Sequence, residues 1–518
     1  MDGALRGRCR PRSHPAALSL DLEVGGGPGR RIMSTLGRLV SGRRGELLAV
    51  GIIALVAAAL RLYQLGTWSF WGDEIITVER AVDLGGLAPS RWSLSILLTH
   101  FALARWGVSE ASARLMPALL GVATVPVLYF LVRIVFDRPT AILAAVLLAI
   151  SPWHLYWSQN ARFYTSLLLF FTLAIFLFYL GLERDRGVYF LLAAICLGLA
   201  ALERPLAIAF VPVAGVYLIV ARPPLFGVPK GMRWRNMAWL VGPGLLAGIY
   251  LLLTFPALRT PTSWEEIFGW VNTTPFWIAG GVVFYLGIPT VCLALAGAWD
   301  LIARRNRAGL LLLLLSVLPL LGVMLLSLFQ YTANRYVFIS LGGWVVLAAA
   351  AATALLRAGK PARRVLAYGV VAALVLAPLS QDVLYFGYQH GNRDNWKAAF
   401  GYVELHRKEG DFVVTPDRRL GDYYLGGETL GMATLQLEPL LAANRRIWFV
   451  EDLNVVQKWP WLHEWIWAHA RLVANYDVHV EARKFNMNVF LYDPADASIR
   501  GQASTLANVA PNTSTGGW

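Results

Sequence analysis

The sequence predicts an all-α polytopic membrane domain followed by a small α/β domain. Of its 518 residues, 57% are hydrophobic and only 15% are charged, and the mean hydropathy is +0.53. Soluble domains carry about 25% charged residues, so this composition, with its long apolar runs, indicates a chain that crosses a membrane many times. After about residue 387 the apolar runs stop and shorter helix and strand patterns begin.

Residues 1–45 are polar and basic and contain no apolar stretch of the kind found in a secretory signal peptide. We expect a disordered cytoplasmic segment, or upstream sequence translated in error, since Met33 is a plausible start. Arg38, Arg43 and Arg44 lie just before the first apolar run, which predicts a cytoplasmic N-terminus.

Residues 46–386 contain about eleven candidate spans, each near the ~20 residues that a bilayer requires. The candidates are 46–65, 113–135, 139–155, 163–182, 188–202, 205–221, 237–256, 276–299, 309–329, 337–356 and 365–386. Lys and Arg cluster in alternate loops, while the opposite loops carry isolated arginines. By the positive-inside rule, the long first loop, 66–112, and the C-terminus face outwards from the plasma membrane.

The part of the chain after the spans predicts a small α/β domain on the outer face, residues 387–495. Strand patterns occur at 411–415, 446–450 and 488–492, and helix patterns at 395–408 and 459–474. Residues 496–518 are polar and are expected to be a disordered tail.

Two adjacent acids stand out in the first outer loop. Asp73 and Glu74 follow Trp68, Phe70 and Trp71, aromatic residues of the kind that lie at lipid headgroups. Acids in a loop are most often simply solvated. Adjacent residues do not share a face of a helix or strand. If both acids are functional, we therefore expect them to have different roles: one acts as a base, and the other orients the acceptor or holds sugar.

Single arginines form the second set of candidates. Arg61, Arg162, Arg204 and Arg335 all fall at the predicted outer face. Each has an alternative explanation, because Arg204 can pair with Glu203 and an isolated arginine can reach out to headgroups. Ionisable residues at membrane depth usually face a cavity, and four that converge on one face indicate an anionic ligand, such as phosphate.

Other classes of ligand receive less support. Tyr164 and Tyr336 can belong to an ordinary aromatic belt. His100 and His154 stand alone, without the spacing of metal ligands, so a divalent metal is left open and unsupported. The net charge of +14 comes from loop residues and does not indicate nucleic acid binding.

Several short motifs then occur in a recognisable order. They are Arg61 with Leu65-Gly66 and Trp71-Gly72-Asp73-Glu74, the run Ala113–Gly121, the run Ser151–Tyr164 with its Ser-Gln-Asn-Ala-Arg-Phe-Tyr, then Asn334-Arg335-Tyr336, and finally Asp394–Ala399 with Gly410-Asp411. This order resembles the GT-C superfamily of membrane glycosyltransferases, and most of all the protein O-mannosyltransferase-like family that includes the lipid A aminoarabinose transferases. Many relatives carry His-Pro-Pro after the acidic pair, where this chain has Ala88–Leu94.

The resemblance implies an inverting glycosyltransferase that uses a polyprenyl-phosphate-linked sugar as donor, with a protein, lipid or glycan hydroxyl as acceptor. It implies that Asp73 is the base and that Glu74 orients the acceptor or holds the sugar. The remaining implied roles are phosphate binding by Arg162 and Arg335, with support from Arg61 and Arg204, and donor or sugar contacts from Tyr164, Tyr336 and Gln159. The alternative function is a transporter or flippase of a polyprenyl-linked glycan, which inverted repeats and broken helices would favour.

Overall fold

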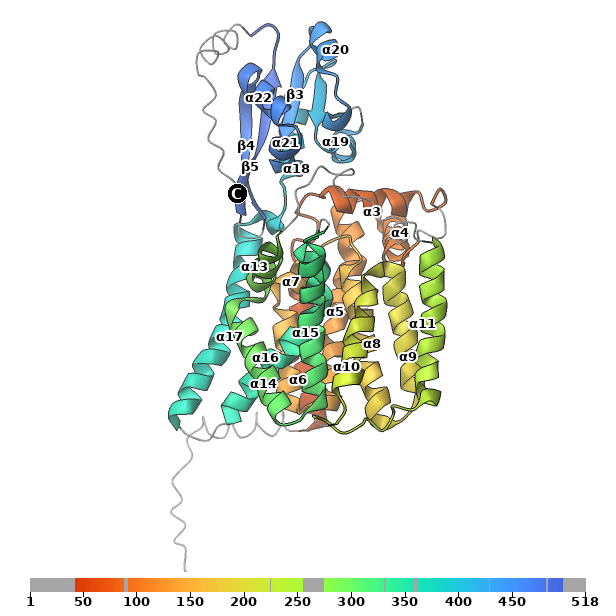
Figure 1. Ribbon diagram of the computed structural model, residues 1–518. Coiled ribbons are helices and arrows are strands. Elements are labelled where there is room, and N and C mark those ends of the chain that lie inside the picture. Colours follow the sequence, from red (N-terminus) through yellow and green to blue (C-terminus); the bar gives the residue numbers. More distant parts are fainter. Residues whose placement is uncertain are drawn as a thin grey trace, which may run out of the picture. The chain divides into compact units, whose positions relative to one another are not determined.

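A computed structural model describes residues 42–87, 92–223, 225–254, 274–329, 332–357, 361–427, 429–480 and 483–496 (Figure 1). The predicted disordered segments lie almost wholly outside these ranges. Met1–Ala49 and Val50–Trp518 form two separate units. The first unit contains the start of helix α2 (Arg43–Leu62), and the second contains the rest of α2 and all other elements.

Six long apolar helices are able to cross a membrane, or up to eight if two bent helix pairs each count as one span, among the residues described. The six candidates are α2, α5 (Glu110–Val135), α8 (Tyr164–Arg184), α15 (Arg307–Leu326), η4 (Asn334–Ser340) joined to α16 (Leu341–Arg357), and α17 (Pro361–Gly387). The chain is therefore a multi-pass membrane protein. The predicted count of about eleven spans is not confirmed.

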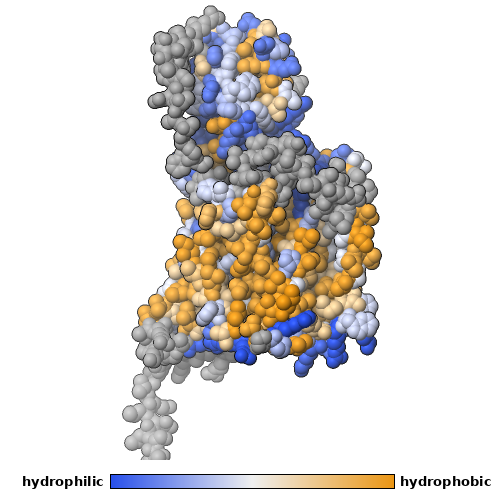
Figure 2. Space-filling view, viewed as in Figure 1, coloured by the Kyte–Doolittle hydropathy of each residue, from blue (hydrophilic) through white to orange (hydrophobic). Residues whose placement is uncertain are grey.

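Two bent helix pairs explain part of the difference between the predicted eleven spans and the six long apolar helices. Helices α6 (Arg138–Ala149) and α7 (Pro152–Ser158) meet at 55°, and α13 (Pro275–Leu286) and α14 (Ile288–Ala303) meet at 97°. The second of these pairs was predicted as one straight span, 276–299, and Gly287, with its positive φ, separates its halves. Helices α9 (Gly187–Glu203), α10 (Phe210–Val220) and α11 (Trp234–Thr254) complete the helical part, whose visible side in Figure 2 is broadly apolar.

The first outer loop is largely helical. Helix α3 (Gly72–Val82) carries the acidic pair in its first turn, and α4 (Leu94–Trp106) corresponds to the short apolar stretch of this loop. Ser93 caps α4 by accepting a hydrogen bond from the Ile96 amide. Both helices lie near the top of the helical part in Figure 1.

The C-terminal part forms a five-stranded sheet in the order β2-β1-β3-β5-β4, in which β1 is parallel to β2 and β3, and β5 is antiparallel to β3 and β4. Its elements are η5 (His390–Asn392), α18 (Trp396–His406), β1 (Phe412–Thr415), α19 (Arg418–Leu425), β2 (Thr429–Gly431), η6 (Met432–Thr434), α20 (Leu437–Ala442), β3 (Ile447–Glu451), α21 (Leu453–Lys458), α22 (Pro460–His469), β4 (Arg471–Val480) and β5 (Arg483–Tyr492). The three predicted strands correspond to β1, β3 and β5. The predicted helix 459–474 ends earlier, because β4 begins at Arg471.

Successive side chains of each strand point to opposite faces of the sheet, and buried apolar side chains form a core on each face. Val413 and Trp448 point to the face covered by α18 and α19, where Phe70 and Ile75 of the first outer loop join the same cluster. On the other face, Phe449 packs with residues of α21 and α22. The sheet therefore shares a hydrophobic core with the loop that carries the acidic pair.

Candidate active site

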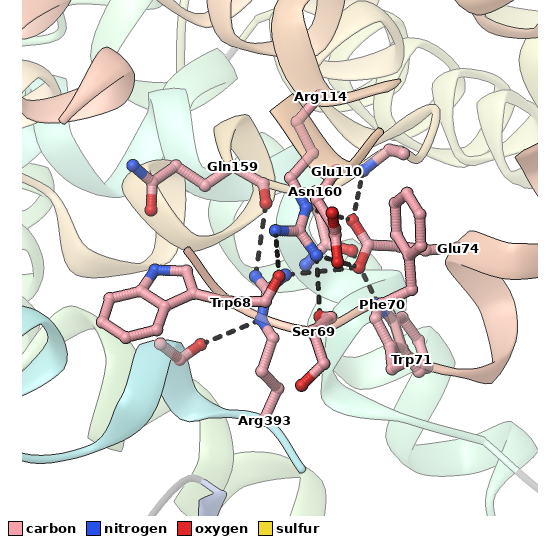
Figure 3. Close-up of polar contacts among 12 residues, drawn as sticks. Trp68, Ser69, Phe70, Trp71, Glu74, Glu110, Arg114, Gln159, Asn160 and Arg393 are labelled. Carbon is pink, nitrogen blue, oxygen red and sulfur yellow. Dashed lines mark hydrogen bonds and ion pairs between the residues drawn. The ribbon is translucent and has the colours of Figure 1, made fainter. Parts of the chain in front are cut away.

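Glu74 is completely buried in a network of positive charge (Figure 3). Its two carboxylate oxygens accept hydrogen bonds from Nε and Nη2 of Arg114 at 2.8 and 2.7 Å. The amide of Ala161 donates to it at 2.7 Å, and Nη1 of Arg393 lies 3.2 Å away. The sequence predicted that Glu74 faces the acceptor or sugar; here its carboxylate instead joins three segments of the chain.

Burial alone would raise the pKa of Glu74. The charges of Arg114 and Arg393, with the hydrogen bonds from Arg114 and Ala161, outweigh burial and hold its pKa below the ordinary value. Arg114 also donates to the carbonyls of Trp68 and Ser69 at 2.8 Å. A buried carboxylate bonded in this way fixes the path of the chain into α3.

Asp73 occupies the next position on α3 but has a different environment. Its side chain is 30% exposed, and its Oδ2 lies 3.4 Å from Nη2 of Arg162 and 3.8 Å from Nη1 of Arg335. Arg162 also donates to the Asp73 carbonyl at 2.7 Å and to the Thr77 hydroxyl at 2.9 Å. The two acids thus have different surroundings, and Asp73 is the accessible one.

Three of the four predicted arginines gather around Asp73. The guanidinium groups of Arg162 and Arg204 lie 5.2 and 4.6 Å from the centre of the Phe163 ring. Arg335 lies over Trp71 at 5.7 Å. Two guanidinium groups beside one carboxylate, with the guanidinium of Arg204 over the neighbouring Phe163 ring, provide the donors that a phosphate group requires.

Arg61, the fourth predicted arginine, is fully buried and holds the bend between α6 and α7. It donates to the carbonyls of Leu148 and Ala149, at 3.2 and 2.9 Å, and lies 2.6 Å from Nδ1 of His154. A helix end leaves backbone carbonyls without an intrahelical donor, and Arg61 supplies one here. We therefore leave Arg61 out of the proposed donor site.

The residues predicted to contact the donor or sugar also divide into those that stabilise the fold and those that lie beside the arginines. Gln159 is fully buried; it donates to the carbonyls of Arg61 and Tyr63 at 3.1 and 2.7 Å and accepts from the Tyr385 hydroxyl at 2.9 Å. Tyr336 is partly exposed, and the Arg335 guanidinium lies 5.7 Å from the centre of its ring. Gln159 thus stabilises the fold around α2, whereas Tyr336 remains beside the arginines.

Tyr164 is 2% exposed and starts α8, with its ring centre 3.9 Å from that of Trp157. It directly follows Phe163, whose ring centre lies 5.2 and 4.6 Å from the guanidinium groups of Arg162 and Arg204.

Arg114 and Arg393 were not predicted as site residues. Arg114 belongs to the Ala113–Gly121 motif, so its position in the motif order was a usable signal. Arg393 begins the C-terminal part, more than 300 positions from Glu74, and no local pattern connects the two. In the parts of the chain that the structure describes, no three His, Cys, Asp or Glu side chains are grouped to hold a metal ion.

A family model described as dolichyl-phosphate-mannose-protein mannosyltransferase matches residues 92–258. Among curated proteins, no sequence matches the chain. Solved structures do match in fold. ArnT from Cupriavidus metallidurans in the apo state has a TM-score of 0.56 at 14% identity and covers 87% of this chain and 98% of its own.

ArnT bound to undecaprenyl phosphate gives a TM-score of 0.55 at 15% identity, over 88% of this chain and 99% of its own. The Archaeoglobus fulgidus oligosaccharyltransferase tethered with an acceptor peptide containing the NVT sequon gives 0.52 at 14% identity, over 81% of this chain and 70% of its own. The chain thus shares its fold with proteins captured with a lipid phosphate or an acceptor peptide.

Proposed function

We propose that the chain is a membrane glycosyltransferase of the GT-C superfamily, and that it transfers a sugar from a polyprenyl-phosphate donor to an acceptor hydroxyl, with inversion, at the outer face of the membrane; the family-model match and the shared fold support this. The observation that carries this proposal is the partly exposed Asp73 carboxylate beside Arg162 and Arg335. A base and a phosphate-binding group in one place are what this reaction requires.

In the proposed reaction the acceptor oxygen attacks the anomeric carbon of the donor sugar from the face opposite the phosphate. The bond from that carbon to the phosphate oxygen breaks, and the polyprenyl phosphate leaves with the bonding pair. Asp73 takes the proton of the acceptor hydroxyl. Arg162, Arg335 and Arg204 offset the charge that builds up on the leaving phosphate. Tyr336, which is partly exposed beside Arg335, contacts the donor in this proposal, while the buried Tyr164 supports the segment that carries Arg162.

Donor binding supplies a direct test of the arginine roles. Because Arg335 is partly exposed and adjacent to Asp73, Arg335→Ala is expected to weaken binding of a polyprenyl-phosphate sugar at least tenfold, a loss of about 1.4 kcal/mol. Purified protein and a panel of radiolabelled polyprenyl-phosphate sugars measure this affinity. Arg105→Ala is the matched control, since Arg105 is an exposed arginine in the last turn of α4, with its guanidinium over the Trp106 ring. Unchanged donor affinity in Arg335→Ala contradicts the assignment.

Asp73→Asn tests the base. It retains size and one acceptor oxygen but lacks the ability to take a proton, so transfer is expected to fall at least 100-fold while donor binding persists. Transfer at the wild-type rate would exclude Asp73 as the base. If the protein instead moves intact donor across a vesicle membrane and no sugar reaches an acceptor, the transporter alternative is supported.

A further inference from the structure

The helical part contains a cavity of about 370 Å³ at the end of α8 that lies far from Asp73. α8 begins at Tyr164, two residues after Arg162. At about 1.5 Å per residue, Glu183 of the cavity lies about 28 Å further along the axis, close to the ~30 Å thickness of the hydrocarbon core of a bilayer. The cavity therefore lies at the membrane boundary opposite the proposed transfer site, where Figure 2 shows hydrophilic residues along the lower rim of the helical part.

Three segments of the chain line this cavity. They are the end of α8 with Tyr179 and Glu183, the chain at 225–227, and the link between α14 and α15 with Arg305, Asn306 and Arg307. Glu183 pairs with Nη1 of Arg307 at 2.9 Å, and Nη2 of Arg307 donates to the Gly227 carbonyl at 2.6 Å. This pair holds the three segments together, and the volume falls in the range of about 300–1,000 Å³ that small-molecule sites occupy.

Arg305 supplies the charge that this ion pair leaves over. Its side chain is exposed, lines the cavity, and makes no ion pair or hydrogen bond with any residue that the structure describes. With Arg307 and Glu183 compensating each other, the lining carries an excess of one positive charge. A guanidinium group with all its donors available is suited to bind a phosphate group.

The backbone at Arg305 provides a second, independent observation. Arg305 has a φ of 54°, in the left-handed region, and its amide and that of Asn306 bond back to carbonyls of α14 at 2.8 Å. Helices that end in this way usually have glycine or asparagine at this position, because a long side chain adds strain there. The turn itself therefore disfavours arginine, which indicates that the side chain has a role of its own.

A narrow apolar cleft adjoins the cavity at Tyr179, which lines both. Ile175 and Phe176 of α8, and Leu311 and Leu312 of α15, line the cleft. These residues lie about one turn from the cavity along their helices, in the direction of the membrane interior. A polar cavity at the membrane boundary that continues into an apolar cleft fits a ligand with a charged head and an apolar chain.

We propose that this cavity binds the headgroup of a phospholipid with one net negative charge and headgroup hydroxyls, such as phosphatidylglycerol, and that an acyl chain follows the cleft. Arg305 donates to the phosphodiester, and a headgroup hydroxyl donates to the Glu183 carboxylate. One negative charge balances the excess positive charge of the lining, whereas a zwitterionic headgroup leaves it uncompensated. Basic pockets between membrane helices bind anionic headgroups in this manner. Occupancy of this site is separate from the proposed transfer at Asp73.

Arg305→Asn and Arg304→Asn form a matched pair of variants that tests this site. The two arginines are adjacent, but Arg304 lies outside the cavity lining and pairs with Asp300 of α14 at 2.9 Å. Asparagine suits the left-handed conformation at position 305. Radiolabelled phosphatidylglycerol, phosphatidylethanolamine and inorganic phosphate are each titrated onto the full-length protein in detergent micelles. We expect Arg305→Asn to weaken affinity for phosphatidylglycerol at least tenfold and Arg304→Asn to stay within twofold of wild type.

Arg305→Gly provides a second variant if Arg305→Asn folds poorly, because glycine is the residue that this turn favours. Without lipid its Tm should equal or exceed that of the wild type, while its affinity for phosphatidylglycerol falls as in Arg305→Asn. An equal loss of affinity in the Arg304 and Arg305 variants means attraction to general surface charge and overturns the inference. So does a wild type that does not bind phosphatidylglycerol, that binds phosphatidylethanolamine equally well, or that binds inorganic phosphate as tightly as the lipid.

Discussion

Replacing Glu74 with Gln should destabilise the protein rather than merely weaken acceptor binding. The carboxylate is fully buried and compensates two guanidinium groups, those of Arg114 and Arg393. A glutamine amide has no charge, and its NH2 group would point one donor at other donors. Removing one partner of a buried ion pair costs about 3–5 kcal/mol, because the remaining charges stay buried without compensation.

Thermal unfolding of the detergent-purified protein measures this loss through the fluorescence of its 20 tryptophans. We expect Glu74→Gln to lower the Tm by about 3–5 °C, because an unfolding entropy of about 2.1 cal/mol/K per residue gives about 1 °C per kcal/mol for a chain of 518 residues. Glu79→Gln is the control: Glu79 pairs with Arg419 while 49% exposed, and exposed pairs contribute about 0–1 kcal/mol. If Glu74→Gln unfolds within 1 °C of the wild type and only the acceptor KM rises, our reasoning about Glu74 is refuted.

Glu74 also makes the stability of the folded protein depend on pH. Burial raises the pKa of Glu74, but the charges of the two arginines and the hydrogen bonds to the carboxylate lower it by more than burial raises it. The folded pKa therefore lies below the ordinary 4.5. A lowered carboxyl pKa means that the unfolded chain binds more protons in this range. The contribution of Glu74 to stability is thus complete above about pH 4.5 and is lost as the pH falls through its folded pKa, and Glu74→Gln should lack this acid-sensitive part.

Three further predictions concern stability. Arg61→Met should lower the Tm by several degrees without changing donor KM in the protein that remains folded, because its guanidinium bonds backbone carbonyls at the helix bend. Gly297→Ala should destabilise the helical part in thermal unfolding, since its Cβ would lie 2.2 Å from a carbonyl oxygen of α16, while Gly198→Ala, with open space around it, should not. Burial raises the pKa of Asp394, and the charge of Asp452 raises it further; burial also raises the pKa of Asp452. The folded chain therefore keeps protons that the unfolded chain loses, so the Tm should fall as the pH rises from 5 to 8, and Asp394→Asn should flatten that fall. A Tm independent of pH in the wild type contradicts this.

The sequence was sufficient to predict a multi-pass membrane protein, which the apolar helices confirm. The resemblance noted in the sequence agrees with the family model that matches residues 92–258 and with the fold shared with ArnT. Hydropathy recognises apolar length, which a bilayer imposes on every span. It does not register a sharp bend within an apolar run, such as the one at Gly287, so the sequence predicted a straight span where the structure has two helices.

Strands were predicted where they are buried on both faces. β1 and β3 are short runs of apolar residues in the middle of the sheet. β2 has three residues, too few for any period, and β4 lies at an edge where its residues alternate only weakly between exposed and buried positions. Edge strands have one unpaired side and thus a weaker sequence pattern.

The roles of individual arginines depend on which backbone carbonyls nearby lack a donor, and a sequence does not reveal this. Arg61 and Arg162 are both lone arginines at the predicted outer face. The bend after α6 leaves carbonyls that Arg61 satisfies. Arg162 also donates to one backbone carbonyl, that of Asp73, through Nη1, but its Nη2 lies 3.4 Å from the Asp73 carboxylate, a contact between charges for which a phosphate can compete. We therefore assign Arg61, whose donors are used by carbonyls at a helix bend, to the fold, and propose that Arg162, beside a partly exposed acid, binds the ligand.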